Sequence, residues 1–383
     1  MNTINLYFLL FISMFIWSCS SESPANQDID RIFVAIEELR IGQPDGDENY
    51  MFGEVKDVAL GIKGRIIVSD QQGPIVRMYD NEGNFLKNIG REGWGPGEYT
   101  RISGMKAFND GKLALWNASL MNINVYDPDG EYLEVHTVNS SLHAPDLFKA
   151  GKENNFFVKT TINRDSEKPN WQWGWLNVSQ KGEVTDTLEV PRDEVDRPLT
   201  FVLFTAQGSV HAFIEWPVST INTTGELIFA ENNKNYEFEL RTKKGPVKKV
   251  TRNFDPATLL SEEREQWDAW TNYYSGRGAE NKVPEFKPAF KDIFTDAEGR
   301  IWVWRYVEAE YTELRVAPDY GPESNWWEPP TFDVFMADGR YYATVSLPLN
   351  ANFKDAKGDK VIATLTGEEG EEYVVRYHLE DAK

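Results

Sequence analysis

The sequence predicts an all-β fold: a six-bladed β-propeller that is closed by an N-terminal strand and carries one helical insertion between blades four and five. The first supporting observation is a motif, Tyr-Asp-x-x-Gly at 79–83, which returns at 126–130, 47 residues later. The second is that polar and apolar residues alternate beside each copy, which is typical of β-hairpins with glycine at the turn. The third is the interval itself, because a hairpin unit repeated at this spacing indicates a propeller.

Residues 1–18 predict a signal peptide, because they contain no Asp, Glu, Lys or Arg, and 6–17 is apolar apart from Ser13. Such a run is typical of a signal-peptide core and is shorter than the ~20 residues that a membrane-spanning helix needs. The only cysteine, Cys19, follows directly. The segment therefore resembles a bacterial lipoprotein signal, with Cys19 as the lipidation site at the head of a hydrophilic tether, 19–30. An ordinary cleaved signal and a retained anchor are the alternatives, and all three predict export to the bacterial cell envelope.

The first three blades follow the tether. Blade one is predicted from strands at 55–60, 65–70, 75–79 and 84–89. Blade two repeats the order at 104–108, 112–116, 123–126 and 131–138. Blade three is predicted at 147–150, 155–161, 171–178 and 184–190. The connector 90–99 holds four glycines and one proline, which disfavour a regular helix or strand interior.

The remaining blades are less regular. Blade four is predicted from 201–204, 209–216, 226–230, 236–240 and 247–252, one strand more than a blade needs, so its boundaries stay open. Blade five is predicted at 291–295, 300–306, 332–336 and 341–347, and blade six at 351–355, 360–366 and 372–379. The strand at 31–41 is predicted to complete blade six, which would remove the open sheet edges and extend the propeller over 31–383.

One segment, about 255–285, breaks the β pattern. Asp255 followed by Pro256 is typical of a helix start. Apolar and aromatic residues then recur at helical spacing, at Leu260, Trp267, Trp270 and Tyr274. We therefore expect an amphipathic helix whose aromatic stripe lies on one end of the propeller, or which acts as a lid over a ligand.

Composition excludes some functions. The net charge of −21 repels phosphate backbones, so we expect no nucleic-acid partner. With Cys19 lipidated, no disulfide is available, and burial alone must hold the fold. The 13 Trp and 22 Phe residues suit broad sheet faces that need bulky side chains.

Two stretches carry a family resemblance. The sequence from Phe52 to Tyr99, including Ile-Ile-Val-Ser-Asp at 66–70 and Gly-Pro-Gly-Glu-Tyr at 95–99, resembles the NHL-like six-bladed β-propeller lipoproteins of Bacteroidota and related bacteria. The stretch from Pro288 to Tyr377, including Asp-Ala-Glu-Gly-Arg-Ile-Trp-Val at 296–303, is similar to the same group. The resemblance implies a fold and an envelope location, and it carries over no catalytic residue.

No catalytic or cofactor-binding residue is predicted from the sequence. The four histidines, His136, His143, His211 and His378, show no metal-ligand spacing. Lactonase-like propellers hold a divalent cation with Glu, Asn and Asp, and NHL lyase-like propellers hold zinc with histidines; neither set can be matched here. A metal-dependent hydrolase or lyase with a site in the central channel remains the alternative function, and it would require several such side chains to converge there.

The aromatic residues point to binding. Trp326 and Trp327 are adjacent in a proline-rich segment, and Arg305 follows Trp304. Flat indole rings stack on sugars and peptide aromatics, and arginine can assist. We therefore predict a non-catalytic binding or scaffold propeller that recognises a protein or carbohydrate ligand on one face. The candidate residues of that face are Trp326, Trp327, Trp267, Trp270 and Arg305.

Overall fold

The structure is a computed structural model. It describes residues 31–138, 148–151, 155–164, 171–179, 181–191, 213, 217–242, 245–275, 284–313, 322–367 and 370–382. The predicted signal peptide and tether, with Cys19, lie outside the described residues. Within the described part, no helix has both the length and the apolar character that a membrane crossing requires.

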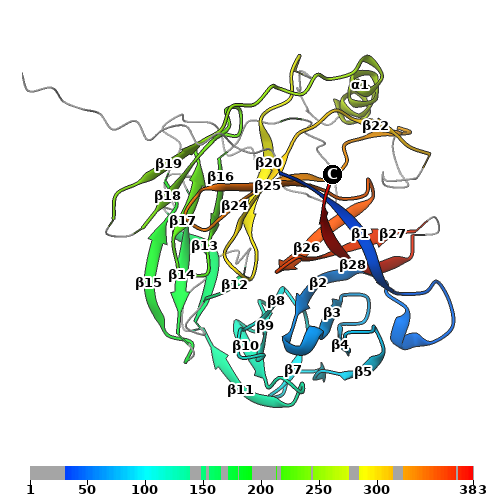
Figure 1. Cartoon of the computed structure of the whole chain (residues 1–383). Helices are drawn as coiled ribbons and strands as arrows, with labels where there is room; N and C mark the ends of the chain where they lie inside the picture. Colours follow the sequence, from blue (N-terminus) through cyan, green and yellow to red (C-terminus); the bar gives the residue numbers. More distant parts are fainter. Residues whose placement is uncertain are drawn as a thin grey trace, which may run out of the picture.

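The described strands form a six-bladed β-propeller (Figure 1), as the sequence predicts. The strand bounds of the first three blades agree with prediction to within a few residues. Blade one consists of β2 (Val55–Leu60), β3 (Ile66–Asp70), β4 (Ile75–Tyr79) and β5 (Phe85–Asn88). Blade two consists of β8 (Gly104–Ala107), β9 (Leu113–Asn117), β10 (Asn122–Tyr126) and β11 (Tyr132–Thr137). Blade three consists of β12 (Phe148–Ala150), β13 (Phe156–Arg164), β14 (Trp171–Val178) and β15 (Val184–Glu189).

Short elements surround blade one. Two 3-10 turns, η1 (Glu48–Tyr50) and η2 (Ile62–Gly64), lie before β2 and β3. In the connector to blade two, β6 (Arg91–Glu92) and β7 (Glu98–Tyr99) pair in parallel. The connector is therefore not entirely irregular, although each of its strands is only two residues long.

Blade four differs from the prediction. It consists of β16 (Val218–Ile221), β17 (Leu227–Ala230), β18 (Glu237–Arg241) and β19 (Lys248–Thr251). The innermost strand, β16, was not predicted, because Val-Ser-Thr-Ile shows little alternation. The predicted strand at 201–204 and nearly all of 209–216 lie outside the described residues.

The closure of the ring is confirmed. Blade five consists of β20 (Phe290–Thr295), β21 (Ile301–Arg305), β24 (Thr331–Phe335) and β25 (Tyr341–Ser346). Blade six consists of β26 (Ala351–Lys357), β27 (Lys360–Thr366) and β28 (Glu372–Asp381). The N-terminal strand β1 (Ile32–Ile41) pairs antiparallel with β28 as the fourth strand of blade six. It also pairs in parallel with β25, which the sequence did not suggest, so blades five and six share one eight-stranded sheet.

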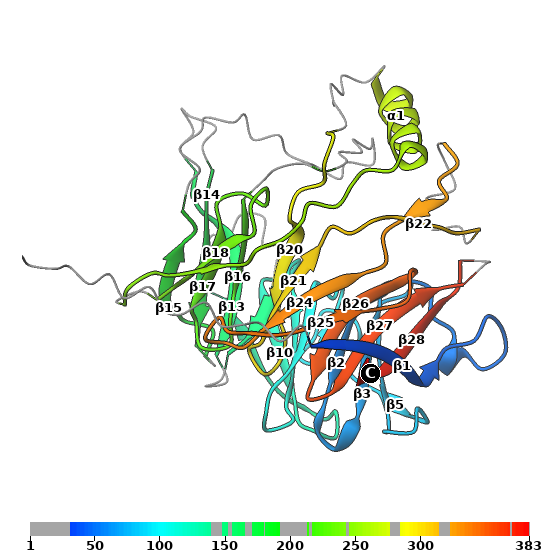
Figure 2. The same ribbon diagram turned by 45° about the horizontal axis from the view of Figure 1, so that its top comes forward.

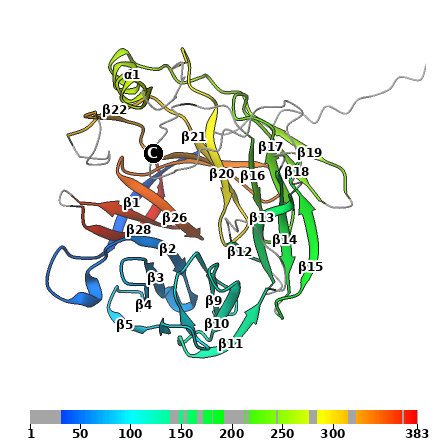
Figure 3. The same ribbon diagram turned by 180° about the vertical axis from the view of Figure 1, so that it is seen from behind.

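The hydrophobic cores lie between the blades. Each of six buried clusters among the described residues joins two adjacent blades, as Met78 and Met105 do for blades one and two. The cluster that joins blades six and one contains Val374 beside Val58. In the view from behind, the strands β2, β12, β20 and β26 lie nearest the centre of the ring (Figure 3). A cavity lined by residues of the innermost strands β8, β12, β16, β20 and β26 marks the central channel.

The helical insertion begins later than predicted. Helix α1 spans Ser261–Ser275, whereas Asp255 and Pro256 are not helical. An isolated bridge between Thr258 and Phe286 accounts for this, because it keeps the preceding segment extended. Helix α1 lies beside the short ribbon of β22 (Glu310–Tyr311) and β23 (Trp326–Trp327), at the edge of the ring (Figure 2).

Candidate functional site

The innermost strands of five blades repeat a lysine. In three blades the lysine precedes an aspartate, and in two it precedes an alanine. The Lys-Asp pairs are 56–57 on β2, 291–292 on β20 and 354–355 on β26; the Lys-Ala pairs are 106–107 on β8 and 149–150 on β12. This repeat was readable in the sequence and was missed there, because it gains meaning only once the five strands are known to face one channel.

The three aspartates occupy equivalent places. A β-bulge immediately precedes each of Asp57, Asp292 and Asp355 in its strand. In each case Oδ1 accepts a hydrogen bond from the next backbone N–H, at 3.0 Å, 2.8 Å and 2.9 Å respectively. Bulges re-aim side chains, and here they place three carboxylates of blades one, five and six at the channel.

Three lysines surround these carboxylates. Lys106 Nζ lies 3.4 Å from Asp57 Oδ1, which links blades two and one. Lys354 Nζ donates to the carbonyl of Val55 at 3.1 Å, which links blades six and one. Lys149 Nζ reaches from blade three to the carbonyl of Thr295 in blade five, at 3.3 Å. Because blade four lies between those two blades, the Lys149 side chain spans part of the channel interior.

A cavity of about 260 Å³ opens among these groups. A space of this size admits several waters or one small organic molecule. Its charged lining is Lys106, Lys149, Lys354, Asp292, Asp296 and Asp355, and its aromatic lining is Phe108, Phe294, Trp304 and Phe353. We call the three lysines with Asp57, Asp292 and Asp355 the channel ring.

Burial shifts the proton affinities of the ring. Removal from water lowers the pKa of Lys149 to about 8; neighbouring Lys106 adds to the effect and the ring aspartates oppose it. Burial also raises the pKa of Asp355 to about 6, against the pull of Lys106. The pKa of Lys354 is lowered, mainly by burial. Burial would lower the pKa of Lys106 as well, but Asp57 and Asp355 outweigh it and raise that pKa.

The ring presents donors and acceptors side by side. Ionised carboxylates only accept hydrogen bonds and ammonium groups only donate them.

Among the residues that the structure describes, no group of three or more His, Cys, Asp or Glu side chains is arranged to hold a metal ion. His136 is buried near Glu134, His378 lies 3.0 Å from Asp359, and His143 and His211 lie outside the described residues.

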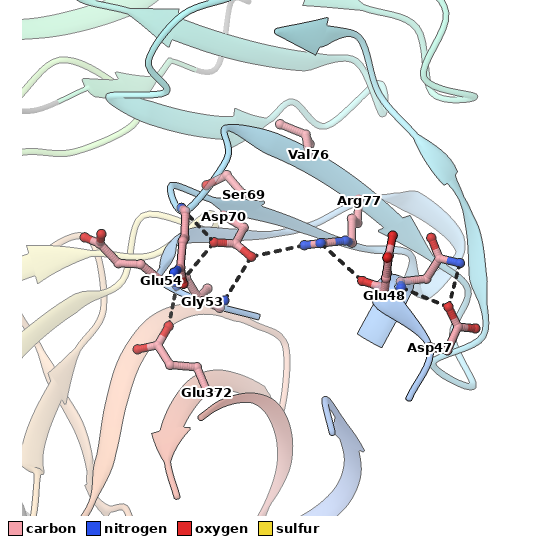
Figure 4. Close-up of polar contacts among 12 residues, drawn as sticks. Asp47, Glu48, Gly53, Glu54, Ser69, Asp70, Val76, Arg77 and Glu372 are labelled. Atoms are coloured by element: carbon pink, nitrogen blue, oxygen red, sulfur yellow. Dashed lines mark hydrogen bonds and ion pairs between the residues drawn. The ribbon is translucent and has the colours of Figure 1, made fainter. Parts of the chain in front are cut away.

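Blade six is fastened to blade one through Glu372, which reaches the start of β2 (Figure 4). The Glu372 carboxylate accepts a hydrogen bond from the backbone N–H of Val55. Val55 thus has its N–H bound by Glu372 and its carbonyl bound by Lys354, and both partners belong to blade six. These contacts satisfy backbone groups at the free inner edge of β2, the innermost strand of its sheet.

The predicted tryptophans gather around α1. Trp270 is 3% exposed, and its indole N–H donates to the Ser324 hydroxyl. Trp267 packs edge-on against Trp327, with ring centroids 6.1 Å apart. Trp326 and Trp327 are partly buried in β23. These side chains therefore hold the insertion together, and their recognition of a ligand stays a prediction.

One glutamine and one lysine anchor the insertion. The Gln266 side chain on α1 accepts from the backbone N–H of Trp326 and donates to its carbonyl, both at 2.9 Å. Lys287, with a fully buried side chain, lies 2.8 Å from Glu263 of α1 and 2.7 Å from Glu328. Burial raises the pKa of Glu263.

Arg305 lies apart from the tryptophans. Its guanidinium is 3.6 Å from Asp333, a fully buried residue that also lies 3.5 Å from Arg252 and accepts from the Tyr236 hydroxyl at 2.8 Å. The arginine side chain is one-quarter exposed. The structure thus brings Trp267, Trp270, Trp326 and Trp327 together and places Arg305 in a separate network between blades four and five.

Comparison with known proteins agrees with the architecture. Residues 46–197 match the family model DUF5128, described as a 6-bladed beta-propeller. A protein of Bacteroides fragilis described as exported is 11% identical, with 94% of this chain and 98% of that chain covered and a TM-score of 0.50. A member of the duf4221 family from Bacteroides vulgatus is 10% identical, with 92% and 99% covered and a TM-score of 0.54. Virginiamycin B lyase from Staphylococcus aureus is 10% identical, with 88% of this chain and 98% of that chain covered and a TM-score of 0.41. No curated protein matches the chain.

Proposed function

We propose that the protein is a lipid-anchored binding propeller of the bacterial cell envelope, which holds a small polyhydroxylated, sugar-like ligand in its central channel. The observation that carries the proposal is the channel ring: three lysines and three aspartates from five blades, of which all but Asp57 line a cavity of about 260 Å³. A cavity of this size suits one sugar unit, free or at the end of a glycan, better than the surface of a folded protein.

The chemistry of the ring favours hydroxyl groups. A hydroxyl both donates and accepts, so each one can bridge an aspartate and a lysine of the ring. The aromatic rings of Trp304, Phe294 and Phe353 supply apolar surface for the C–H face of a sugar. The opposite charges of the ring balance, which disfavours a strongly anionic or cationic ligand.

Binding of defined saccharides tests this proposal. We expect a subset of mono- or oligosaccharides to bind the purified full chain in calorimetry and to raise its melting temperature. Asp292→Asn keeps the size of the side chain and removes its charge, and it should weaken that binding by about tenfold or more, since a charged hydrogen bond contributes roughly 1.5–3 kcal/mol. Asp45→Asn, at an exposed position outside the ring, is the matched control. Saccharide binding that Asp292→Asn leaves unchanged, or binding of proteins alone, would overturn the proposal.

Export and anchoring rest on the N-terminal sequence. The apolar run at 6–17 followed by Cys19, the likeness to NHL-like lipoproteins of Bacteroidota and the exported Bacteroides fragilis protein of similar fold support them. Cys19→Ala should move the protein from the membrane fraction to the soluble exported fraction and abolish labelling by a fatty-acid probe. Labelling that survives this substitution would contradict a lipid on Cys19.

A further inference from the structure

Lys149 differs from the other two lysines of the channel ring in how its amine is held. Lys106 forms an ion pair with Asp57 at 3.4 Å, and Lys354 donates to two backbone carbonyls, at 3.1 Å and 3.4 Å. Among the described residues, Lys149 Nζ donates one hydrogen bond, to the carbonyl oxygen of Thr295 at 3.3 Å. That single neutral contact makes its amine the easiest of the three to release toward a molecule in the cavity.

We propose that Lys149 is a reactive amine that condenses with the aldehyde or keto group of an open-chain sugar or similar hydroxycarbonyl compound in the channel. This inference rests on the proposed function, because it requires the channel to be the ligand site. It adds a covalent step to the binding role.

The surroundings of Lys149 favour the neutral amine. The amine lies in the cavity near Lys106, and the loss of water together with that like charge lowers its pKa to about 8. About a tenth of the amine is then unprotonated at pH 7, against less than about a thousandth for an ordinary lysine. A lysine that is desolvated and placed beside a second cation is a recognised form of activated nucleophile.

The reaction balances with the groups present. Lys149 Nζ attacks the carbonyl carbon, forming a C–N bond and a carbinolamine. The carbinolamine C–O bond then breaks, and the oxygen leaves as water with two hydrogens that originate on the amine. Nothing is oxidised or reduced. Asp355 lines the same cavity as Lys149, and its raised pKa, about 6, lets it both give and take a proton near neutrality, so we assign it the proton transfers of this step.

Reductive trapping with glyceraldehyde tests the proposal. The full chain is incubated with D-glyceraldehyde and cyanoborohydride, and the modified lysines are identified by peptide mass mapping. We expect Lys149 to be labelled at least about tenfold faster than the exposed Lys181 of the same blade, because of its larger neutral fraction. The rate at Lys149 should rise with pH and level off above about pH 8, following its own titration.

Two variants and one analogue separate the possible results. Lys149→Arg should remove the fast label, whereas Lys181→Arg should leave it. A saccharide alditol, which has no carbonyl group, reports on binding alone. Alditol binding that depends on Asp292, without preferential labelling of Lys149, would overturn the imine and leave the binding function standing. If the alditol does not bind and Lys149 is not preferentially labelled, the binding function and the imine are both overturned. A melting temperature of Lys149→Arg close to that of the parent shows that the variant is folded.

Discussion

Asp70 and Arg77 form a buried ion pair across the β3–β4 hairpin, with Arg77 Nη1 3.2 Å from Asp70 Oδ2 (Figure 4). Their side chains are 2% and 10% exposed. Asp70 also accepts from the backbone N–H groups of Gly53 and Glu54, at 3.1 Å and 3.0 Å. The pair therefore fixes the chain that enters the innermost strand of blade one.

Arg77→Met should strongly destabilise the protein, because it leaves the Asp70 carboxylate buried without its cation. We expect a loss of about 3–5 kcal/mol in the free energy of unfolding, measured by urea denaturation. The double variant with Asp70→Asn should lose less than the two single losses combined, since the uncompensated charge is gone. Arg40→Gln, which removes an exposed ion pair with Glu37, is the control and should cost much less. Equal losses for Arg77→Met and Arg40→Gln would contradict the importance of this pair.

Much of this architecture could be predicted from the sequence, because hairpin turns and alternation mark most strands directly. The inner strand of blade four could not be predicted, since two of the four residues of Val218–Ile221 are polar and the segment shows no clear alternation. The start of α1 was misplaced because Asp255 and Pro256 satisfy the local rules for a helix, while the distant bridge from Thr258 to Phe286 overrides them.

The channel site was harder to predict than the fold. The Lys-Asp dipeptides at 56–57, 291–292 and 354–355 are visible in the sequence, but charged residues on a strand are ordinarily solvent-facing. Their common direction depends on β-bulges, which leave no reliable mark in a sequence. The tryptophans at 267, 270, 326 and 327 are conspicuous in the sequence, and in the structure they pack helix α1 against the β22–β23 ribbon.

The closing strand offers a test within one element. Ile41 is 2% exposed and packs in the cluster between blades six and one, whereas Ile36 on the same strand is 46% exposed. Ile41→Ala should lower the free energy of unfolding by about 2–5 kcal/mol, as for other buried large-to-small changes. Ile36→Ala is the matched control and should cost far less. Equal effects in thermal and urea unfolding would argue that β1 is not part of the cooperative fold.

Lys287 is expected to hold the helical insertion. Lys287→Met keeps most of the side-chain volume and leaves the carboxylates of Glu263 and Glu328 without this cation. We predict that the free energy of unfolding falls by about 3–5 kcal/mol, unless the insertion detaches before the propeller unfolds. Detachment would appear as faster proteolysis within 261–286 at an unchanged melting temperature. Lys249→Met, which removes an exposed ion pair with Glu237, should change neither readout. Proteolysis and unfolding that both stay at the parent level in Lys287→Met would refute the anchoring role.

Asp355 should make stability depend on pH in an identifiable window. Burial raises its pKa from 3.8 to about 6, so the folded state binds this proton more tightly than the unfolded chain does. The contribution of Asp355 to stability is therefore most favourable below pH 4 and falls as the pH rises to about 6. A shift of two units corresponds to at most about 3 kcal/mol.

The difference in unfolding free energy between the parent and Asp355→Asn should follow this fall and stay level above pH 6. Asp45→Asn, measured across the same range, isolates the effect from general charge repulsion. A parent-minus-variant difference that is flat between pH 4 and 6 would mean that Asp355 is not buried in the channel as an ionised group, and that the proton transfers assigned to it need another residue.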